Sequence, residues 1–313
     1  MIPLLFGITL ITYLAIFFLP GGPTAGIMGD LNPKVSPEVR DKLIRQYQLD
    51  KPFYVQYWNW VRGMAKLDFG RSFKDNRPVM SIIGERLPRT ILLEGLSLLF
   101  SFLIAIPIGI ISAIRQNKFI DRALTLFVFI GFSVPTYWIA LLAIILFGIY
   151  LGWVPITGFQ SLFADELSWP LKIIDIAKHL ALPVMVSSLT SLAGLSRYVR
   201  NGMLEVIRQD YIRTARAKGL PENQIIFRHV LKNTMIPVIT IVGLSIPGLI
   251  SGGVIFETIF SYPGLGRLAW EAVVSRNVPV LMATVTFGAF LTLVGNLIAD
   301  ILYAYADPRI RYR

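Results

Sequence analysis

Few side chains in this 313-residue chain are of the kinds that enzymes use to make or break bonds. The sequence has no cysteine, and its two histidines, His179 and His229, lie in separate segments. A metal site would need more ligands at matched spacing, and neither H-E-x-x-H nor G-x-S-x-G occurs. There is no Gly-Lys dipeptide, which excludes a G-x-x-x-x-G-K-S/T phosphate loop. We therefore expect no catalytic residue, no bound metal and no cofactor in this chain.

Charged residues gather instead between residues 197 and 233. The basic ones are Arg197, Arg200, Arg208, Arg213, Arg216, Lys218, Arg228 and Lys232, and the acids are Glu205, Asp210 and Glu222. A charged segment of this kind can dock a partner protein, or it can fix the topology of a membrane protein and lie on anionic lipid. The residues alone favour neither interpretation.

The spacing within this segment predicts two short helices joined by a tight turn. The apolar residues that would share one face of the first helix are Met203, Leu204, Ile207, Tyr211 and Ala215. The basic residues that would point away are Arg208, Arg213, Arg216 and Lys218. Gly219 is placed to end this helix, and Pro221 with Glu222 to begin the second. The apolar face of the second helix would consist of Ile225, Ile226 and Val230.

Long apolar stretches must position this charged segment. Hydrophobic residues make up 54% of the chain and charged residues 16%, against about 25% charged in ordinary soluble domains. Six stretches are long enough to cross about 30 Å of hydrocarbon as helices. They cover residues 2–20, 88–113, 121–150, 180–200, 234–256 and 280–304. We expect an all-α, multi-pass membrane protein with six transmembrane helices, the first retained rather than cleaved as a signal peptide.

The distribution of charge sets the expected orientation. The net charge is +11, and basic residues concentrate in the 114–122 and 197–233 connections and in the tail. Such a bias marks cytoplasmic loops, so the positive charge requires no nucleic-acid partner. Both termini would then be cytoplasmic, with a helical insertion outside. The expected division is a first transmembrane helix at 1–20, an external insertion at 21–87, a five-helix core at 88–305 that contains the charged loop at 203–232, and a cytoplasmic tail at 306–313.

The external insertion has helix signals of its own. Ser36-Pro37-Glu38 is typical of a helix start, and Asp50 with Pro52 predicts a second start. The residues that repeat at helical spacing in the second stretch are Phe53, Tyr57, Trp60, Val61 and Met64. Aromatic residues here more often form a small core, or rest at the lipid interface, than bind a ligand.

The apolar stretches contain helix-breaking residues but few charges. Proline and glycine interrupt them at Pro107, Pro135, Pro247 and Gly248, among other positions. Away from the basic connections, the acidic residues inside these stretches are Glu94 and Asp300, each near an end. Membrane helices tolerate such breaks beside cavities or other helices, and ion-coupled carriers place charges deep in the membrane. The pattern favours a conduit that is driven by a motor outside the bilayer.

Over essentially its whole length, the sequence resembles the inner permease subunits of ABC importers for dipeptides and oligopeptides. The segment "DYIRTARAKGL" at 210–220 is similar to the EAA-type coupling loop of that family. "LDKPFYVQYWNW", followed by "LDFGRSF" and "PV", resembles its first external domain. "ETIFSYPGLGRL" at 257–268 resembles its motif after the fifth span, and "DPRIR" its C-terminal end. Several long motifs in the same order make the resemblance specific.

The sequence also departs from the general family pattern. The EAA loop usually begins Glu-Ala-Ala and ends Leu-Pro, where this chain has Arg213-Thr214-Ala215 and Leu231-Lys232. Gly219 is kept, and this variant narrows the resemblance to the peptide branch. The Pro-Gly-Asp-Pro that often follows the first span reads Pro20-Gly21-Gly22-Pro23 and lacks the acid. The basic residues that often precede that span are absent.

The resemblance implies a type I ABC importer permease in the cytoplasmic membrane of a bacterium or archaeon. The chain would pair with a second homologous permease, two ATP-binding subunits that hold ATP and Mg²⁺, and an extracytoplasmic substrate-binding protein. It would be a transport subunit in the lipid bilayer and not an enzyme. The implied ATPase-coupling residues are Tyr211, Arg213, Thr214, Ala215, Arg216, Ala217, Lys218, Gly219, Leu220 and Pro221. The expected residues of the translocation path or gate are Glu94, Pro107, Pro135, Pro247, Gly248 and Glu257. The expected residues of the binding-protein contact are Tyr57, Trp60, Asp68, Pro263 and Gly264.

Alternatives to a peptide importer differ in substrate or in class. Permeases of this kind also serve oligosaccharides, nickel complexes or glutathione, and the binding protein usually selects among them. A stand-alone channel or ion-coupled carrier is disfavoured by the sparse charge inside the apolar stretches. A membrane-embedded enzyme would need a nucleophile–base pair or a metal site, and the sequence shows neither.

Overall fold

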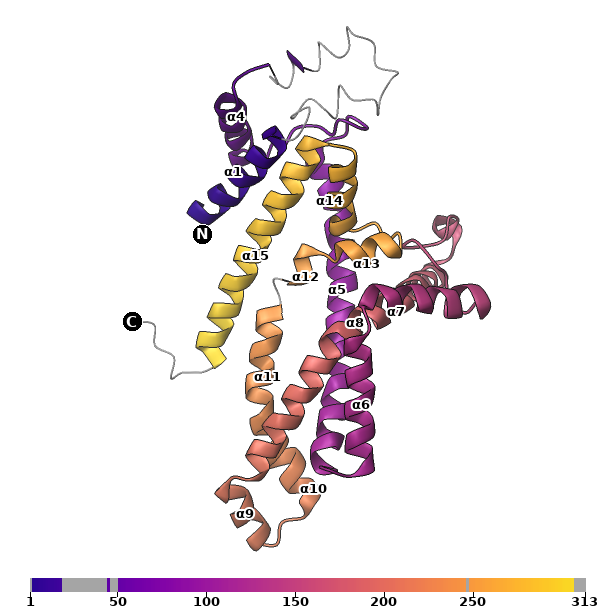
Figure 1. The fold of residues 1–313 in the computed structure, drawn as a ribbon, viewed down its shortest axis with the longest axis vertical. Coiled ribbons are helices and arrows are strands. Elements are labelled where there is room, and N and C mark those ends of the chain that lie inside the picture. The colour runs from indigo at the N-terminus through magenta and orange to yellow at the C-terminus, as the bar shows by residue number, and fades with distance from the viewer. Residues whose placement is uncertain (1, 19–43, 46–49, 246–247, 307–313) are drawn as a thin grey trace. The chain divides into compact units, whose positions relative to one another are not determined.

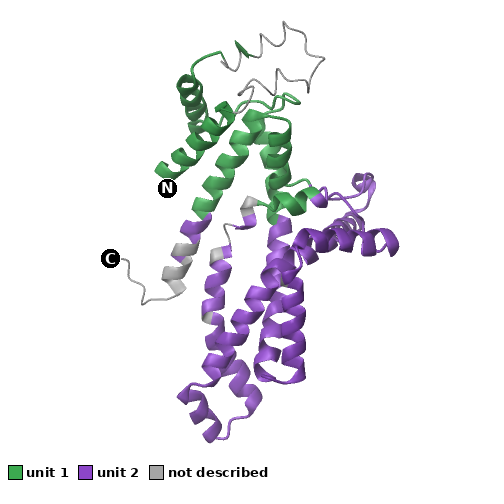
Figure 2. Ribbon diagram, in the orientation of Figure 1, with its two compact units in different colours: residues 1–91, 250–258, 263–294 green, residues 92–249, 259–262, 295–313 purple. Residues whose placement is uncertain are grey.

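The computed structural model describes residues 2–18, 44–45, 50–245 and 248–306. These residues form helices joined by short connections, with one isolated β-bridge between Arg71 and Pro78 (Figure 1). Contacts divide the chain into two compact units, which Figure 2 colours separately. Unit 1 comprises residues 1–91, 250–258 and 263–294, and unit 2 comprises residues 92–249, 259–262 and 295–313.

Unit 1 is built around two groups of buried side chains. Its elements are α1 (Ile2–Phe18), α4 (Phe53–Ala65), α14 (Leu265–Val274), most of α13 (Val254–Ile259), and the first parts of α5 (Val79–Ile114) and α15 (Val278–Ala306). One group consists of Phe69, Val79, Ile82, Ile83, Leu265, Leu268, Ala272, Val280 and Ala283. The other consists of Tyr13, Ile16, Tyr57 and Met282, and packs α1 against α4.

Unit 2 holds the long helices that carry the charged segment. In chain order its elements are the rest of α5, α6 (Phe119–Ser133), α7 (Thr136–Ala143), the π-helix η2 (Ile144–Tyr150), the short 3₁₀-helix η3 (Ala164–Glu166), α8 (Trp169–Ile207), α9 (Asp210–Ala217), α10 (Glu222–Gln224), the π-helix η4 (Ile225–Val230), α11 (Leu231–Ser245), the start of α12 (Gly248–Ser251) and the end of α15. Helix α8 packs against α6, α7 and α11. A shared apolar core joins α5, α8, α9, η4 and α11.

Close approach of α5 to α8 depends on one glycine. At Gly109 a Cβ atom would lie 2.7 Å from the Val199 side chain and 2.9 Å from the carbonyl oxygen of Ser196. Any larger residue would push the two helices apart, and membrane helix contacts are enriched in small residues for this reason. Gly109 therefore serves packing rather than bending.

The described helices account for part of the predicted set of spans. Three are long and apolar enough to cross a membrane: Val79–Ile114, Trp169–Ile207 and Val278–Ile298. Two bent pairs also qualify if each is one span: Phe119–Gly131 with Thr136–Tyr150, at 92°, and Glu222–Met235 with Pro237–Gly243, at 41°. Ile2–Phe18 is apolar but shorter. Among the described residues this gives three spans, or five with the bent pairs, and the count of six stays a prediction.

The bends occur where the backbone chemistry requires them. At the first break Val134 is extended, with ψ of 131°, and Pro135 precedes the first turn of α7. A residue before proline is pushed out of the helical region, and proline has no N–H to continue the ladder. Between α12 and α13, Gly252 has a φ of +71°. This left-handed conformation favours glycine and separates the two helices.

One expected boundary shifts in the structure. Helix α5 begins at Val79, so the expected boundary between residues 87 and 88 falls inside a continuous helix. Helix α4 begins after Pro52, as predicted. The helix start predicted at Ser36, Pro247 and the "DPRIR" motif lie outside the described residues, as does the side chain of Asp300.

Candidate coupling site

Helix α9 is anchored to the long helices by one face. Ile212 is fully buried and Ala215 nearly so, and both belong to the apolar core of unit 2. Met203 of α8 and Ile225 of η4 are buried in the same core. The short helix lies at one end of unit 2 and packs against η4 (Figure 1). A displacement of α9 would therefore reach α8 and the helix that continues into α11.

The predicted apolar stripe through Tyr211 is wrong in one respect. Helix α8 ends at Ile207, and α9 begins at Asp210 after the extended residue Gln209. The break rotates the second helix, so that Ile212 rather than Tyr211 faces the core. Tyr211 is 47% exposed, and its hydroxyl oxygen accepts a hydrogen bond from Asn233 Nδ2 at 3.2 Å. Tyr211 is thus available at the surface of the loop.

The turn after α9 has the predicted form. Gly219 has a φ of +77°, and its N–H donates to the carbonyl oxygen of Arg216 at 2.9 Å. Pro221 caps α10, which begins at Glu222. Ile225, Ile226 and Val230 are buried as predicted. Helix α10 continues through η4 into α11 without a loop, so the second helix of the segment is the start of a long one.

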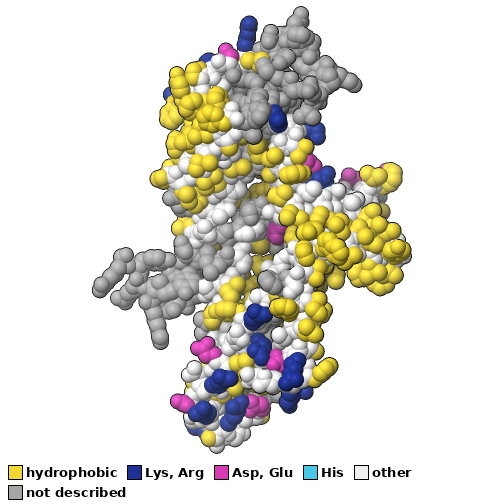
Figure 3. Space-filling model, viewed as in Figure 1, with side chains coloured by type: hydrophobic (Ala, Val, Ile, Leu, Met, Phe, Trp, Pro, Cys, Tyr) yellow, Lys and Arg dark blue, Asp and Glu magenta, His cyan; other side chains and the backbone are white. Residues whose placement is uncertain are grey.

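Charged side chains cover the exposed face of the loop. Arg216 makes two hydrogen bonds to the Glu222 carboxylate, at 2.7 and 3.1 Å, and so joins the helix before the turn to the helix after it. Arg213 lies 3.4 Å from Asp210 in an exposed pair. Lys218 is exposed at the end of α9. Figure 3 shows basic and acidic side chains gathered at this end of unit 2. Exposed ion pairs contribute about 0–1 kcal/mol each, so this surface is suited to recognition more than to stability.

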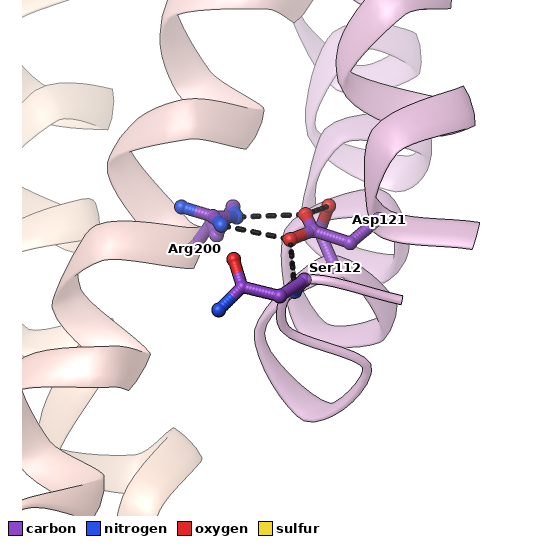
Figure 4. Close-up of polar contacts among 4 residues, drawn as sticks. Ser112, Asp121 and Arg200 are labelled. Carbon is purple, nitrogen blue, oxygen red and sulfur yellow. Dashed lines mark hydrogen bonds and ion pairs between the residues drawn. The ribbon is translucent and has the colours of Figure 1, made fainter. Parts of the chain in front are cut away.

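A second polar contact joins the α5–α6 hairpin to α8. The Asp121 carboxylate accepts hydrogen bonds from Arg200 Nε and Nη2, both at 2.9 Å, and from the Ser112 hydroxyl at 2.6 Å (Figure 4). The backbone N–H of Asn117 donates to the same carboxylate at 2.9 Å. Asp121 is 3% exposed. A buried carboxylate with this many donors holds the hairpin in one position on α8.

A polar cavity of about 280 Å³ lies within unit 2 among α5, α8, α11 and α12. Its lining residues are Glu94, Ser97, Leu98, Ser101, Ser187, Thr190, Ser191, Ser245, Gly248 and Leu249. Two expected path residues, Glu94 and Gly248, thus share one cavity. Two others lie apart from its lining: Pro107 is exposed on α5, and Pro135 caps α7.

Glu257 has a different environment in unit 1. It is fully buried, and its carboxylate accepts hydrogen bonds from the Thr90 hydroxyl and the backbone N–H of Arg267, both at 2.8 Å. A Cβ atom on Gly264 would collide with this carboxylate. Thr90 also accepts a hydrogen bond from the backbone N–H of Leu265 at 2.8 Å. Glu257 therefore holds the Pro-Gly-Leu-Gly turn against α5, and in this conformation its carboxylate does not face open space.

The residues expected to contact a binding protein divide into buried and exposed ones. Tyr57 is 5% exposed, and its hydroxyl lies 3.0 Å from the Thr9 hydroxyl of α1. Burial raises the pKa of this phenol, and the hydrogen bond with Thr9 offsets part of that rise. Because a docking protein contacts exposed side chains, this burial favours a packing role for Tyr57, and its part in binding-protein docking stays a prediction. Gly264 is buried too, whereas Asp68 is exposed and Trp60 and Pro263 are half-buried.

Two family models match this chain and together span almost all of it. The model described as "binding-protein-dependent transport system inner membrane component" matches residues 105–312. The corresponding N-terminal model matches residues 1–94. The chain belongs to this family.

Relatives of this permease are similar along their whole length. The oligopeptide transport system permease protein AppB of Bacillus subtilis is 44% identical over 312 residues, which cover 99% of this chain and 96% of AppB. The dipeptide transport system permease protein DppB of Escherichia coli is 34% identical over 329 aligned residues, covering 100% and 96%. The transport activities in these two names are those of AppB and DppB.

The fold of the permease is that of a solved ABC transporter. A chain of the MetNI methionine ABC transporter, in an inward-facing conformation, matches with a TM-score of 0.57. The match covers 73% of this chain and 97% of that one at 16% sequence identity. At this identity the likeness concerns the fold alone.

Three residues of the permease that hold the site in place were missed by sequence reasoning. Arg200 is noted only as one of the basic residues of the 197–233 segment, and no motif singles out Asp121 or Thr90. The available signal was a lone acid, Asp121, in an otherwise basic connection. Among the residues that the structure describes, no group of His, Cys, Asp and Glu side chains is placed to hold a metal ion.

Proposed function

We propose that this permease is the transmembrane subunit of an ATP-driven importer that carries dipeptides or oligopeptides across the cytoplasmic membrane. The observation that carries the proposal is the build of α9, which buries Ile212 and Ala215 in the core of the long helices while its charged face stays exposed. The relatives named for oligopeptide and dipeptide transport support peptides as the substrate class.

In the proposed topology the chain crosses the membrane six times and both termini are cytoplasmic. The bent pairs in α6–α7 and in α10–α11 then each form one broken span, and α1 forms the first span. The charged surface around α9 faces the cytoplasm, as the concentration of basic residues favours. The segment between α1 and α5 faces the outside.

Two ATP-binding subunits drive the permease in this proposal, and ATP and Mg²⁺ bind to them. One of them receives α9 and the Gly219 turn in a surface groove, with Tyr211, Arg213 and Lys218 at the contact. When the ATPase closes, the push on α9 passes through Ile212 to α8 and through the α10–η4 segment to α11. A second, homologous permease completes the pathway, in which access alternates between the two sides of the membrane.

An extracytoplasmic binding protein delivers the substrate to the outer segment of the chain. Asp68, Trp60 and Pro263 are at least partly exposed and remain candidates for this contact. Tyr57 and Gly264 hold the surrounding elements in place. Tyr57 fixes α4 on α1, and Gly264 allows the turn to approach Glu257.

Reconstitution tests the proposal. The permease, its homologous partner and the two ATPases are placed in liposomes with ATP, the binding protein is supplied on the other side, and uptake of a labelled dipeptide is followed. Uptake that requires ATP and the binding protein is expected. Uptake by this chain alone without ATP would indicate a channel or carrier instead. Competition by an oligosaccharide, a nickel complex or glutathione, with none by peptides, would assign one of those substrates.

A further inference from the structure

In the polar cavity of unit 2, several of the lining hydroxyl groups already donate their protons to backbone carbonyl oxygens. Ser97 and Ser101 on α5 donate their hydroxyl protons to the carbonyl oxygens of Leu93 and Ser188, at 2.7 and 2.8 Å. Ser245 on α11 donates to a carbonyl of its own helix at 2.8 Å. A hydroxyl has one proton and two lone pairs. These three side chains therefore have only acceptor lone pairs left for a ligand.

On α8, a hydroxyl group that lines the cavity likewise donates its proton to a backbone carbonyl oxygen. Thr190 on α8 donates its proton to the carbonyl oxygen of Ser187 at 2.6 Å. Glu94 is the one ionisable residue among the lining residues, and neither lysine nor arginine lines the cavity. An ionised carboxylate only accepts hydrogen bonds. The lining thus combines one negative charge with several oxygen acceptors whose own protons are already bonded.

An acceptor-rich lining selects a ligand group that is rich in N–H donors and positively charged. An ammonium group has three donors and no acceptor. Every free peptide has such a group at its amino terminus, which is charged near neutral pH. A carboxylate or phosphate would be repelled by the Glu94 charge and by the lone pairs of these four hydroxyl groups. At about 280 Å³ the cavity is at the small end of ligand sites, so it would take the first residue or two of a peptide.

We infer that this cavity is a binding site for the protonated amino terminus of a transported peptide, with Glu94 as the counter-charge and Ser97, Ser101, Thr190 and Ser245 as acceptors. The inference rests on the proposed peptide transport and specifies which end of the peptide the permease holds. Because the recognised group is the backbone ammonium that every free peptide has, this contact does not depend on the sequence of the peptide.

Photocrosslinking tests the site directly. The probes are the dipeptide Ala–p-benzoylphenylalanine and its N-acetylated form, each added to the purified complex without the binding protein. The free dipeptide should crosslink to peptides derived from α5 or α8, as mapped by mass spectrometry. The acetylated form should crosslink about tenfold less, as expected for the loss of one charge-assisted hydrogen bond.

Variants assign the effect to Glu94. Glu94→Gln keeps the shape and removes the charge, so it should lower crosslinking of the free dipeptide about tenfold and remove the preference over the acetylated form. Glu94→Asp, which keeps the charge, should retain part of the crosslinking of the free dipeptide and part of its preference over the acetylated form. Glu166→Gln is the matched control, because Glu166 is an exposed acid of the same unit outside the cavity. It should behave as the unmodified protein.

Uptake and ATP hydrolysis separate this inference from the proposed function. Glu94→Gln should reduce dipeptide uptake while ATP hydrolysis stimulated by the liganded binding protein persists. Equal crosslinking of both probes, or unchanged crosslinking in Glu94→Gln, would overturn the ammonium site and leave peptide import standing. Crosslinking that depends on Glu94 in a complex that takes up no peptide would support the site and overturn the import proposal.

Discussion

Arg200 of α8 donates two hydrogen bonds of 2.9 Å each to the carboxylate of Asp121, one to each oxygen. The two residues belong to different elements, since Asp121 is in the first turn of α6. Asp121 is 3% exposed, and Ser112 and the Asn117 N–H supply its remaining donors. This pair fixes the α5–α6 hairpin against the helix that leads into α9.

Breaking this pair on one side should destabilise the protein more than removing it altogether. Arg200→Met leaves a buried carboxylate without its counter-charge, which costs about 3 kcal/mol or more. Asp121→Asn leaves the guanidinium without an anion. The double variant Arg200→Met/Asp121→Asn should recover part of the loss. Thermal unfolding of the detergent-solubilised complex measures all three, and Arg197→Met, an exposed arginine of the same helix, is the control. Additive losses in the double variant would contradict a direct interaction.

The left-handed turn at Gly219 should be required for coupling. An L-residue in this conformation costs about 1–2 kcal/mol, and proline would also lose the N–H that bonds to Arg216. We expect Gly219→Pro to abolish ATP-driven uptake and Gly219→Ala to reduce it, while the chain still inserts and the complex still hydrolyses ATP. Gly84→Ala changes an exposed helical glycine with open space around it, so it should have little effect. Normal uptake by Gly219→Pro would show that this turn transmits no motion.

The positive charges of Arg216 and Lys218 at the end of α9 should contribute to docking of the ATPase. Arg216 also pairs with Glu222 across the turn. Arg216→Glu with Lys218→Glu reverses two exposed charges, and we expect it to reduce ATP-dependent uptake at least tenfold without loss of membrane insertion. The swap Arg216→Glu/Glu222→Arg allows an ion pair across the turn to form again with reversed polarity.

Uptake by this swap distinguishes the two roles of Arg216. Rescue to near the unmodified rate would mean that Arg216 acts by bracing the turn through Glu222. Continued loss of uptake would mean that the positive charge itself contacts the ATPase. Uptake by the Arg216→Glu/Lys218→Glu variant at the normal rate would exclude both roles.

The turn held by Glu257 should tolerate no side chain at Gly264. Gly264→Ala would place a Cβ atom against the Glu257 carboxylate, so the turn must shift, and the carboxylate would lose the hydrogen bonds that it accepts from the Thr90 hydroxyl and the Arg267 N–H. We expect a loss of about 1–3 kcal/mol per unsatisfied buried group, seen as a lower melting temperature. Thr90→Val, which replaces the hydroxyl with a methyl group of similar size, should produce a similar change. A Gly264→Ala variant of unchanged stability would contradict the close contact.

The shape of the charged loop around α9 was largely predictable because its signals are local. Gly219 ends the first helix and Pro221 begins the second through backbone preferences that a few residues decide. The orientation of α9 was not predictable to the same degree. Helical periodicity predicted that Tyr211 lies on the apolar face. Because the extended residue Gln209 interrupts the helix, α9 has a different orientation, and Ile212 is buried instead.

By itself, the sequence determined an all-helical membrane protein with long apolar helices, a charged loop between two of them, and membership in a transport family. These follow from composition, from helical periodicity and from motifs that are contiguous in the chain. Only the tertiary structure decided which distant residues meet: Arg200 with Asp121, Glu257 with Thr90, and Tyr57 with Thr9. It also placed Glu94 in a cavity where Ser97, Ser101, Thr190 and Ser245 already donate their hydroxyl protons to backbone carbonyls. Such pairings depend on how helices pack in three dimensions, and no local preference along the chain encodes them.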